Sequence, residues 1–144
     1  MSIDRNTALD IWQEMFGDVR WMKDCFGAWM CKEGYGDKEY NTRMTGDDRD
    51  YDYSWNIDHI RPKSDFDNDA DADFNNNFEP MHRKNNQMKS DNYPHFKIDN
   101  ESYTVVKCDI CSSNGEKGYG IKNSSGERVD WKGVEGKYYK TLNK

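Results

Sequence analysis

The stretch of residues 51–60, YDYSWNIDHI, alternates large apolar side chains with polar ones. If the stretch is extended, the apolar side chains at positions 51, 53, 55 and 57 share one face, because successive side chains of a strand point to opposite sides. Pro62 ends the pattern, since proline cannot donate a hydrogen bond to a strand ladder. The sequence therefore predicts a strand with one face packed against a core, in which we expect Tyr53 and Trp55 to be buried.

A polar loop and a short helix are predicted after this strand. Residues 64–77 are rich in Asp and Asn and offer little to bury except Phe66 and Phe74, which is typical of a loop. Residues 80–90, PMHRKNNQMKS, begin with a proline where the first turn of a helix accepts one, and contain no other breaker. On such a helix the side chains at 82, 86 and 89 share one face.

The two ends of the chain differ in pattern. Residues 6–16 repeat apolar side chains at helical spacing and stop at Gly17, which predicts a helix capped by Asn6 or Thr7. A second helix, broken at Gly27, is predicted over residues 18–31. The later runs TVVKC, YGIKN and RVDWKG are β-rich and separated by turn clusters. We therefore predict an α+β chain, with residues 1–98 as one domain and 99–144 as a small antiparallel β appendage.

Aromatic residues make up 14% of the 144 residues, whereas charged residues make up 33%. That much ring surface can supply most of a core in a polar chain, and it argues against disorder. No apolar run approaches the ~20 residues of a membrane span, so no membrane partner is expected. The first residues lack a basic start followed by an apolar stretch, so a cytoplasmic location is expected.

The formal net charge is −6, from 21 basic and 27 acidic residues. An acidic chain binds nucleic acid poorly in a nonspecific way, because phosphate repels it, so a protein partner could assist. The charge is uneven, however. Residues 81–89 carry Arg83, Lys84 and Lys89 without an acid, while residues 65–73 carry a run of Asp. We expect the basic segment to meet any polyanion and the acidic segment to face away.

The four cysteines allow two interpretations. Cys108 and Cys111 form a C-x2-C pair, a spacing that suits a metal knuckle or a redox pair. Cys25 and Cys31 are separated by five residues, which is looser than usual zinc spacing. One structural Zn²⁺ held by all four thiolates is one interpretation. Two buried thiols plus a C-x2-C in a turn is the other, and the looser first pair favours it.

An ordered set of polar side chains spans the predicted strand, loop and helix. Its members are Asp58, His59, Asn77, His82, Asn86 and Lys89. Cleavage of a phosphodiester needs a base to activate water and a cation to offset charge on the leaving oxygen. A histidine at the end of a strand suits the base. The oxygen ligands of Asp58 and Asn86, with water in the remaining positions, suit Mg²⁺ or Mn²⁺ better than Zn²⁺.

The segments WNIDHIRPKS (55–64) and NNFEPMHRKNNQMKSD (76–91) resemble the HNH endonucleases of the ββα-metal, or His-Me finger, superfamily. The shared features are Asp-His-Ile before a proline, an Asn at the second strand, an Asn nine residues later on the helix, and a Lys three residues after that. The upstream FGAWM (26–30) and Tyr35-Gly36 resemble the lead-in of a phage and bacterial subgroup, which implies such an origin. The resemblance implies a ββα-metal finger core.

Roles follow from the resemblance position by position. It implies that His59 is the general base, that Asp58 and Asn86 hold one divalent cation, and that Asn77 holds the turn and orients His59. His82 would touch metal, phosphate or neither, and Lys89 would contact a phosphate of the substrate.

The implied activity is metal-dependent hydrolysis of nucleic acid, with DNA favoured. The competing interpretation is a noncatalytic HNH-like module that binds nucleic acid or a protein. A degenerate module is expected to have lost the base or a ligand, and both are present here, which favours the enzyme.

Overall fold

The computed structural model describes residues 3–37, 41–42, 51–74, 77–108 and 118–129. Within these residues the chain is α+β, with two α-helices and small sheets whose paired strands are all antiparallel. No helix in this part of the chain is both long enough and apolar enough to cross a membrane.

The N-terminal segment folds as a helix followed by a hairpin. Helix α1 (Arg5–Phe16) confirms the helix predicted from residue 6, although its cap is Asp4, whose side chain accepts from the Thr7 N–H at 2.9 Å. The broken helix predicted over residues 18–31 is wrong. Strands β1 (Trp21–Lys23) and β2 (Trp29–Cys31) pair there instead. Gly27 lies in their connection at a φ of +91°, a conformation that glycine adopts at little cost.

Two strands and a helix form the middle of the fold. Strand β5 (Trp55–His59) pairs antiparallel with β6 (Phe78–His82), and α2 (Arg83–Lys89) follows directly. The predicted strand over residues 51–60 is therefore confirmed in its second half. Its first two residues form β4 (Tyr51–Asp52), which pairs with β3 (Asn41–Thr42).

The helix predicted over residues 80–90 begins three residues further along the chain than predicted. Pro80 lies within β6, opposite Ile57 of β5, and the helix begins only at Arg83. A two-stranded sheet leaves each strand with an open edge, where a residue without an N–H is tolerated. The loop between β5 and β6 contains two short 3₁₀ turns, η2 (Lys63–Asp65) and η3 (Asp69–Ala72).

The C-terminal part is a sheet in the order β7 (His95–Ile98), β8 (Glu101–Cys108) and β9 (Gly118–Asn123). Its pairing is antiparallel, as predicted for the region after residue 99. The predicted domain boundary at residue 98 falls in the turn of the β7–β8 hairpin. The last run of the predicted appendage, including Trp131, lies mostly outside the described residues.

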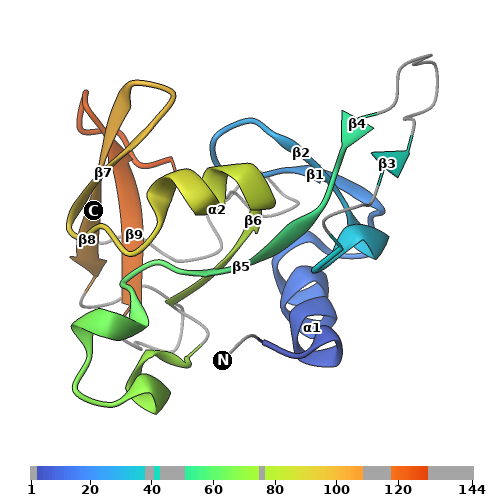
Figure 1. The fold of residues 1–144 in the computed structure, drawn as a ribbon, viewed down its shortest axis with the longest axis horizontal. Coiled ribbons are helices and arrows are strands. Elements are labelled where there is room, and N and C mark those ends of the chain that lie inside the picture. Colours follow the sequence, from blue (N-terminus) through green and yellow to red (C-terminus); the bar gives the residue numbers. More distant parts are fainter. Residues whose placement is uncertain (1–2, 38–40, 43–50, 75–76, 109–117, 130–144) are drawn as a thin grey trace.

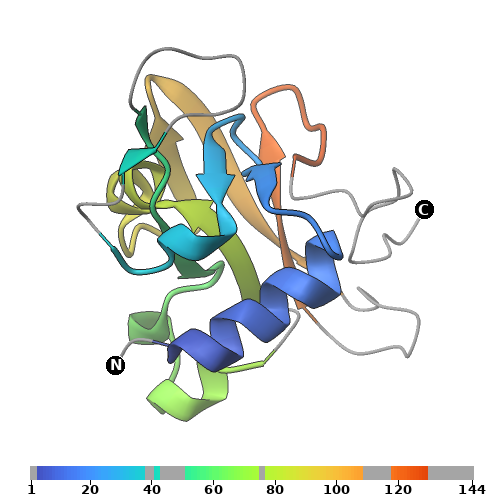
Figure 2. The same ribbon diagram turned by 90° about the vertical axis from the view of Figure 1, so that its right-hand side faces the viewer.

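Two apolar clusters border the β5–β6 hairpin. Trp55, Ile57 and Phe78 pack with α1, and the rings of Trp12 and Trp55 lie 4.7 Å apart. The second cluster joins Ile60 and Met81 to the β7–β9 sheet. Figure 1 shows β5 and β6 between α1 and that sheet, and Figure 2 shows α1 running along the molecule below β1 and β2. Tyr53 and Trp55 are buried as predicted.

One buried carboxylate joins the β1–β2 hairpin to the start of α2. Asp24 Oδ1 accepts from the N–H groups of Phe26 and Ala28 at 3.0 and 2.9 Å. Asp24 Oδ2 accepts from the His82 N–H at 3.0 Å and from Asn85 Nδ2 at 2.8 Å. Four donors from two distant segments thus converge on one side chain.

We predict that Asp24→Ala lowers the free energy of unfolding by roughly 3–5 kcal/mol, because buried donors at His82 and Asn85 lose their acceptor. Urea denaturation, monitored by tryptophan fluorescence, measures this loss of stability. The control is Asp10→Ala, which removes an exposed carboxylate of α1 and should change stability by less than about 0.5 kcal/mol. Equal stability of the two variants would contradict this role of Asp24.

Candidate functional site

A pocket of about 190 Å³ opens where β5 ends. Three of the predicted site residues, Asp58, His59 and Asn86, line it. The first two come from the end of β5 and the third from the middle of α2. The structure thus brings the predicted base and both predicted metal ligands to one cavity. The other lining residues are Ile57, Pro62, Lys63 and Ser90.

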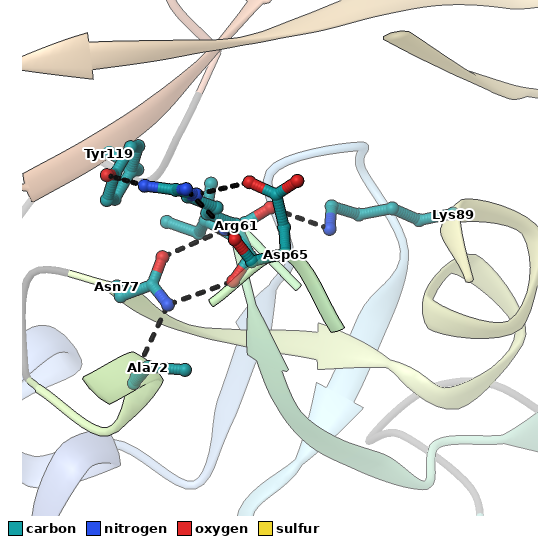
Figure 3. A network of polar contacts seen from close by, with 7 residues as sticks. Arg61, Asp65, Ala72, Asn77, Lys89 and Tyr119 are labelled. Carbon is teal, nitrogen blue, oxygen red and sulfur yellow. Dashed lines mark hydrogen bonds and ion pairs between the residues drawn. The ribbon is translucent and has the colours of Figure 1, made fainter. Parts of the chain in front are cut away.

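Asp58 is buried and forms an ion pair with Lys89 of α2. The Lys89 ammonium lies 3.3 Å from Asp58 Oδ1 and 3.2 Å from Oδ2. It also donates to the backbone carbonyls of His59 at 3.2 Å and Ile60 at 2.9 Å. Figure 3 shows Lys89 reaching from α2 toward the backbone that follows β5. The side chain is 0% exposed, so helix and strand end are joined by a buried, fully engaged cation.

This placement corrects the role predicted for Lys89. A phosphate contact needs an ammonium that faces solvent, whereas this one points into the protein and is occupied by three oxygen-bearing groups. The helical spacing placed Lys89 on the same face as Asn86, but that face packs on β5. Lys89 therefore holds the site together and does not face a substrate.

Asn77 closes the loop that separates the two strands. Its Oδ1 accepts from the Arg61 N–H at 2.8 Å, and its Nδ2 donates to the carbonyls of Arg61 at 3.1 Å and Ala72 at 3.0 Å. These contacts are drawn in Figure 3. The side chain is fully buried, and the Asn77 carbonyl accepts from the Ile60 N–H at 2.9 Å. Asn77 thus fixes the backbone just after His59, which is the turn-holding role that the resemblance implies.

Arg61 anchors the same loop to the C-terminal sheet. Its guanidinium donates to Tyr119 Oη at 2.7 Å and to Asp65 Oδ2 at 2.5 Å, and it lies 4.3 Å from the centre of the Phe66 ring. The hydrogen bond to Tyr119 raises the pKa of Arg61 above its usual value, burial acts against this, and the bond to Asp65 adds to the rise. No local sequence pattern indicates this anchor, because Tyr119 lies 58 residues away from Arg61.

His59 contacts the acidic loop. Its Nε2 lies 2.7 Å from Asp73 Oδ1, and its ring meets that of Phe78 edge-on at 5.3 Å. We expected the acidic segment 65–73 to face away from the site, and for Asp73 this is wrong. The η3 turn ends at Ala72, whose carbonyl is bound by Asn77, and this bond holds the loop's last aspartate beside the end of β5.

The Asn86 amide contacts β5 through its nitrogen. Its Nδ2 donates to Asn56 Oδ1 on the neighbouring strand β5, a bond that does not involve the amide oxygen. Asn86 and Asp58 thus offer two hard oxygen donors beside one pocket. Such donors fit a divalent cation that keeps most of its waters, such as Mg²⁺ or Mn²⁺. Because Lys89 already neutralises Asp58, we expect such a cation to be held loosely.

The structure does not bring His82 to this pocket. Its Nε2 lies 2.9 Å from the Asp52 carbonyl, and its Nδ1 accepts from the Lys84 N–H at 3.1 Å, as a cap of α2. With the ring buried and both nitrogens engaged, His82 has a structural role. Of the three alternatives given for His82, which were metal, phosphate or neither, this placement favours the last.

Arg83 is also engaged inside the protein. Its guanidinium pairs with Asp52 and donates to Ser54 Oγ at 3.0 Å. Burial raises the pKa of Asp52, but hydrogen bonds from Ser54 and Arg83 outweigh it, so the pKa lies below its usual value. The charge of Arg83 is thus offset in place, which weakens the predicted role of this residue in binding a substrate.

Lys63 is the basic side chain of the pocket that sequence reasoning missed. It lies on η2 and lines the pocket with Asp58, His59 and Asn86. The sequence feature that could have indicated Lys63 is its position four residues after His59 and directly after Pro62. The positive charge expected to meet a polyanion was that of residues 81–89 instead.

The described cysteines are thiols that form no disulfide. Cys31 is buried and its Sγ donates to Glu33 Oε2 at 3.0 Å, while Cys25 is partly buried. Across the described residues, no three His, Cys, Asp or Glu side chains are grouped so that they could hold a metal ion. The side chain of Cys108 and all of Cys111 lie outside these residues, so the four-cysteine zinc site stays a prediction.

Comparisons with models of known protein families, with curated proteins and with solved structures found no match.

We predict that Lys89→Met lowers the free energy of unfolding by about 3–5 kcal/mol, because it leaves Asp58 buried without its counter-charge. Chemical denaturation measures the loss. Lys84→Met is the matched control, since Lys84 is an exposed lysine of the same helix and should cost less than about 0.5 kcal/mol. Adding Asp58→Asn to Lys89→Met should recover part of the stability. A neutral Lys89→Met would show that the pair does not hold the helix to the strand.

Proposed function

We propose that this chain is a divalent-metal-dependent endonuclease of the HNH type that hydrolyses phosphodiester bonds of nucleic acid, with DNA as the favoured substrate. The observation that carries the proposal is the pocket at the end of β5, which Asp58, His59 and Asn86 line together. Those are the three positions to which the resemblance gives the base and the metal ligands. The order of β5, β6 and α2 along the chain supports a ββα-metal finger as its frame.

His59 is the general base of this proposal. Imidazole is the side chain best suited to accept a proton near neutral pH. One proton of the attacking water passes to a ring nitrogen of His59, the oxygen forms a bond to phosphorus, and the bond from phosphorus to the leaving oxygen breaks. The ring is partly covered, with 13% of the side chain exposed, and Phe78 packs against its edge. The base is therefore held at the rim of the pocket.

Asp58 and Asn86 hold one Mg²⁺ or Mn²⁺ in this proposal. The bound cation supplies positive charge to the phosphate and to the leaving oxygen. Two protein oxygens leave the other positions to water and substrate, as is usual for Mg²⁺ sites. Lys89 fixes the Asp58 carboxylate and the carbonyls on either side of the β5 end, so both ligand and base are positioned before the substrate arrives.

Lys63 takes the phosphate-binding role that the resemblance gives to Lys89. Among the described residues that line the pocket, it is the one lysine. Because Arg83 is paired with Asp52 and Lys89 with Asp58, binding of a polyanion by this acidic chain rests on local contacts or on help from a partner protein.

A noncatalytic nucleic-acid- or protein-binding module is the second candidate. The observation that favours it is the internal pairing of the site, where Asp58 meets Lys89 and His59 meets Asp73. A module without turnover would keep such pairs for stability alone. A cleavage assay separates the two candidates directly.

We expect the wild-type chain to cleave plasmid or single-stranded DNA with Mg²⁺ or Mn²⁺ and to stop when EDTA is added. His59→Ala should lose roughly 10²–10⁴-fold in cleavage rate, which is the usual contribution of a general base. His95→Ala is the control, since His95 is exposed on β7 and does not line the pocket. Undiminished cleavage by folded His59→Ala would falsify the base assignment, and an inactive wild type would favour the binding module.

We expect Asn86→Ala to weaken Mn²⁺ binding, because it removes one of two protein oxygens from the site. Isothermal titration calorimetry measures the affinity on the full chain. Gln87→Ala is the matched control, because Gln87 is the exposed neighbour on the same helix. If both variants bind Mn²⁺ as tightly as the wild type, the metal is held elsewhere.

A further inference from the structure

We propose that Asp73 is a positioning residue for His59 and fixes which ring nitrogen accepts the proton. This inference rests on the proposed nuclease function, because it deepens the role of the base. The acidic segment 65–73 was expected to face away from the site, yet its last residue contacts the side chain on which the proposed chemistry depends. Asp73 Oδ1 lies 2.7 Å from His59 Nε2, within hydrogen-bond distance.

The chemistry of the two groups determines the tautomer. An ionised carboxylate can only accept hydrogen bonds, so the hydrogen of this bond must sit on Nε2 of the imidazole. A neutral ring protonated at Nε2 carries its lone pair on Nδ1. The nitrogen that takes a proton from water is therefore Nδ1, while Nε2 keeps its hydrogen and remains bound to Asp73.

The carboxylate also offsets the charge that the reaction creates. When water gives a proton to Nδ1, the ring becomes positively charged, and the negative charge of Asp73 lies beside it. No proton has to move to Asp73 for this effect. The neighbouring groups do not replace the Asp73 carboxylate. Lys89 contacts His59 at its backbone carbonyl, and the Asp58 carboxylate is paired with Lys89.

Contacts within the loop place Asp73 where it is. Asp73 donates its N–H to the Ala70 carbonyl at 3.1 Å, and the Ala72 carbonyl is bound by the fully buried Asn77 at 3.0 Å. At the other end of the segment, Asp65 is bound by Arg61. An exposed ion pair between flexible side chains contributes little. This pair differs, because the loop that carries the carboxylate is held at both ends.

The first test compares Asp73→Asn with Asp69→Asn. Asp69 is an exposed aspartate of the same loop, so the two variants change the net charge equally. An asparagine can donate to Nε2 and so allows a hydrogen on Nδ1, which blocks the base. We expect Asp73→Asn to lose roughly 10- to 1000-fold in kcat with little change in KM, and Asp69→Asn to keep the wild-type kcat. Equal kcat values would overturn the proposal.

Rescue by a longer carboxylate separates positioning from simple loop stability. Asp73→Glu retains an acceptor-only group and should recover much of the kcat that Asp73→Asn loses. If Asp73→Glu is as slow as Asp73→Asn while both remain folded by circular dichroism, the carboxylate is not what His59 needs and the proposal fails.

The second test needs no active enzyme and no variant at position 73. Long-range ¹H–¹⁵N NMR on the full chain distinguishes the two neutral tautomers of each histidine. The chain has three histidines, and His59→Gln assigns the signals of His59. We expect the Nε2–H tautomer in the wild type. An Nδ1–H tautomer would overturn the inference. If the chain cleaves no nucleic acid, the proposed function fails, while this spectrum still tests whether His59 has the tautomer that its contact with Asp73 requires.

Discussion

The buried pair between Asp58 and Lys89 is the contact on which the site depends. One ammonium, 0% exposed, binds the carboxylate at the end of β5 and the two backbone carbonyls that follow it. A buried charge is stable only when it is paired and hydrogen-bonded, so this arrangement leaves little freedom to either element. It fixes α2 against β5, and with them the distance between Asn86 and His59 across the pocket. A single lysine therefore sets the geometry that the proposed chemistry requires.

Polar side chains stabilise the loop between β5 and β6, whereas apolar contacts stabilise other parts of the molecule. The segment between β5 and β6 has little to bury, and its shape is held by Asn77 and Arg61. Asn77 satisfies backbone groups that a loop would otherwise leave unpaired in the interior. Arg61 connects the same loop to β9, so the C-terminal sheet supports the site although it does not line the pocket. The site thus stands between two apolar clusters and is itself polar.

Much of the charge near the site is offset inside the protein. Asp52 neutralises Arg83, Lys89 neutralises Asp58, and Asp73 contacts His59. The basic segment that stands out in the sequence is therefore less basic in the folded chain than its composition indicates. Under the proposed function, such an acidic protein would engage a polyanion through a few local contacts, and the positive charge of a bound cation would contribute more to substrate binding.

Local patterns in the chain are sufficient to predict several of its elements. Helical spacing placed α1, alternation placed β5, and the ordered set led to three residues that line one pocket, His59 among them. The prediction is wrong over residues 18–31. The apolar spacing there fits a helix, but the chain forms a hairpin, with Gly27 at a positive φ and the Asp24 carboxylate bound to N–H groups of the turn. The partners of the charged groups, by contrast, depend on how the elements pack and cannot be predicted from local patterns. Lys89 pairs with Asp58, which lies 31 residues away in the sequence. Asp73 contacts His59 because the side chain of Asn77 holds the loop that carries Asp73. Periodicity indicates which face of an element is buried. The partner of a charged side chain is a group on another element, and which group lies there depends on how the elements pack.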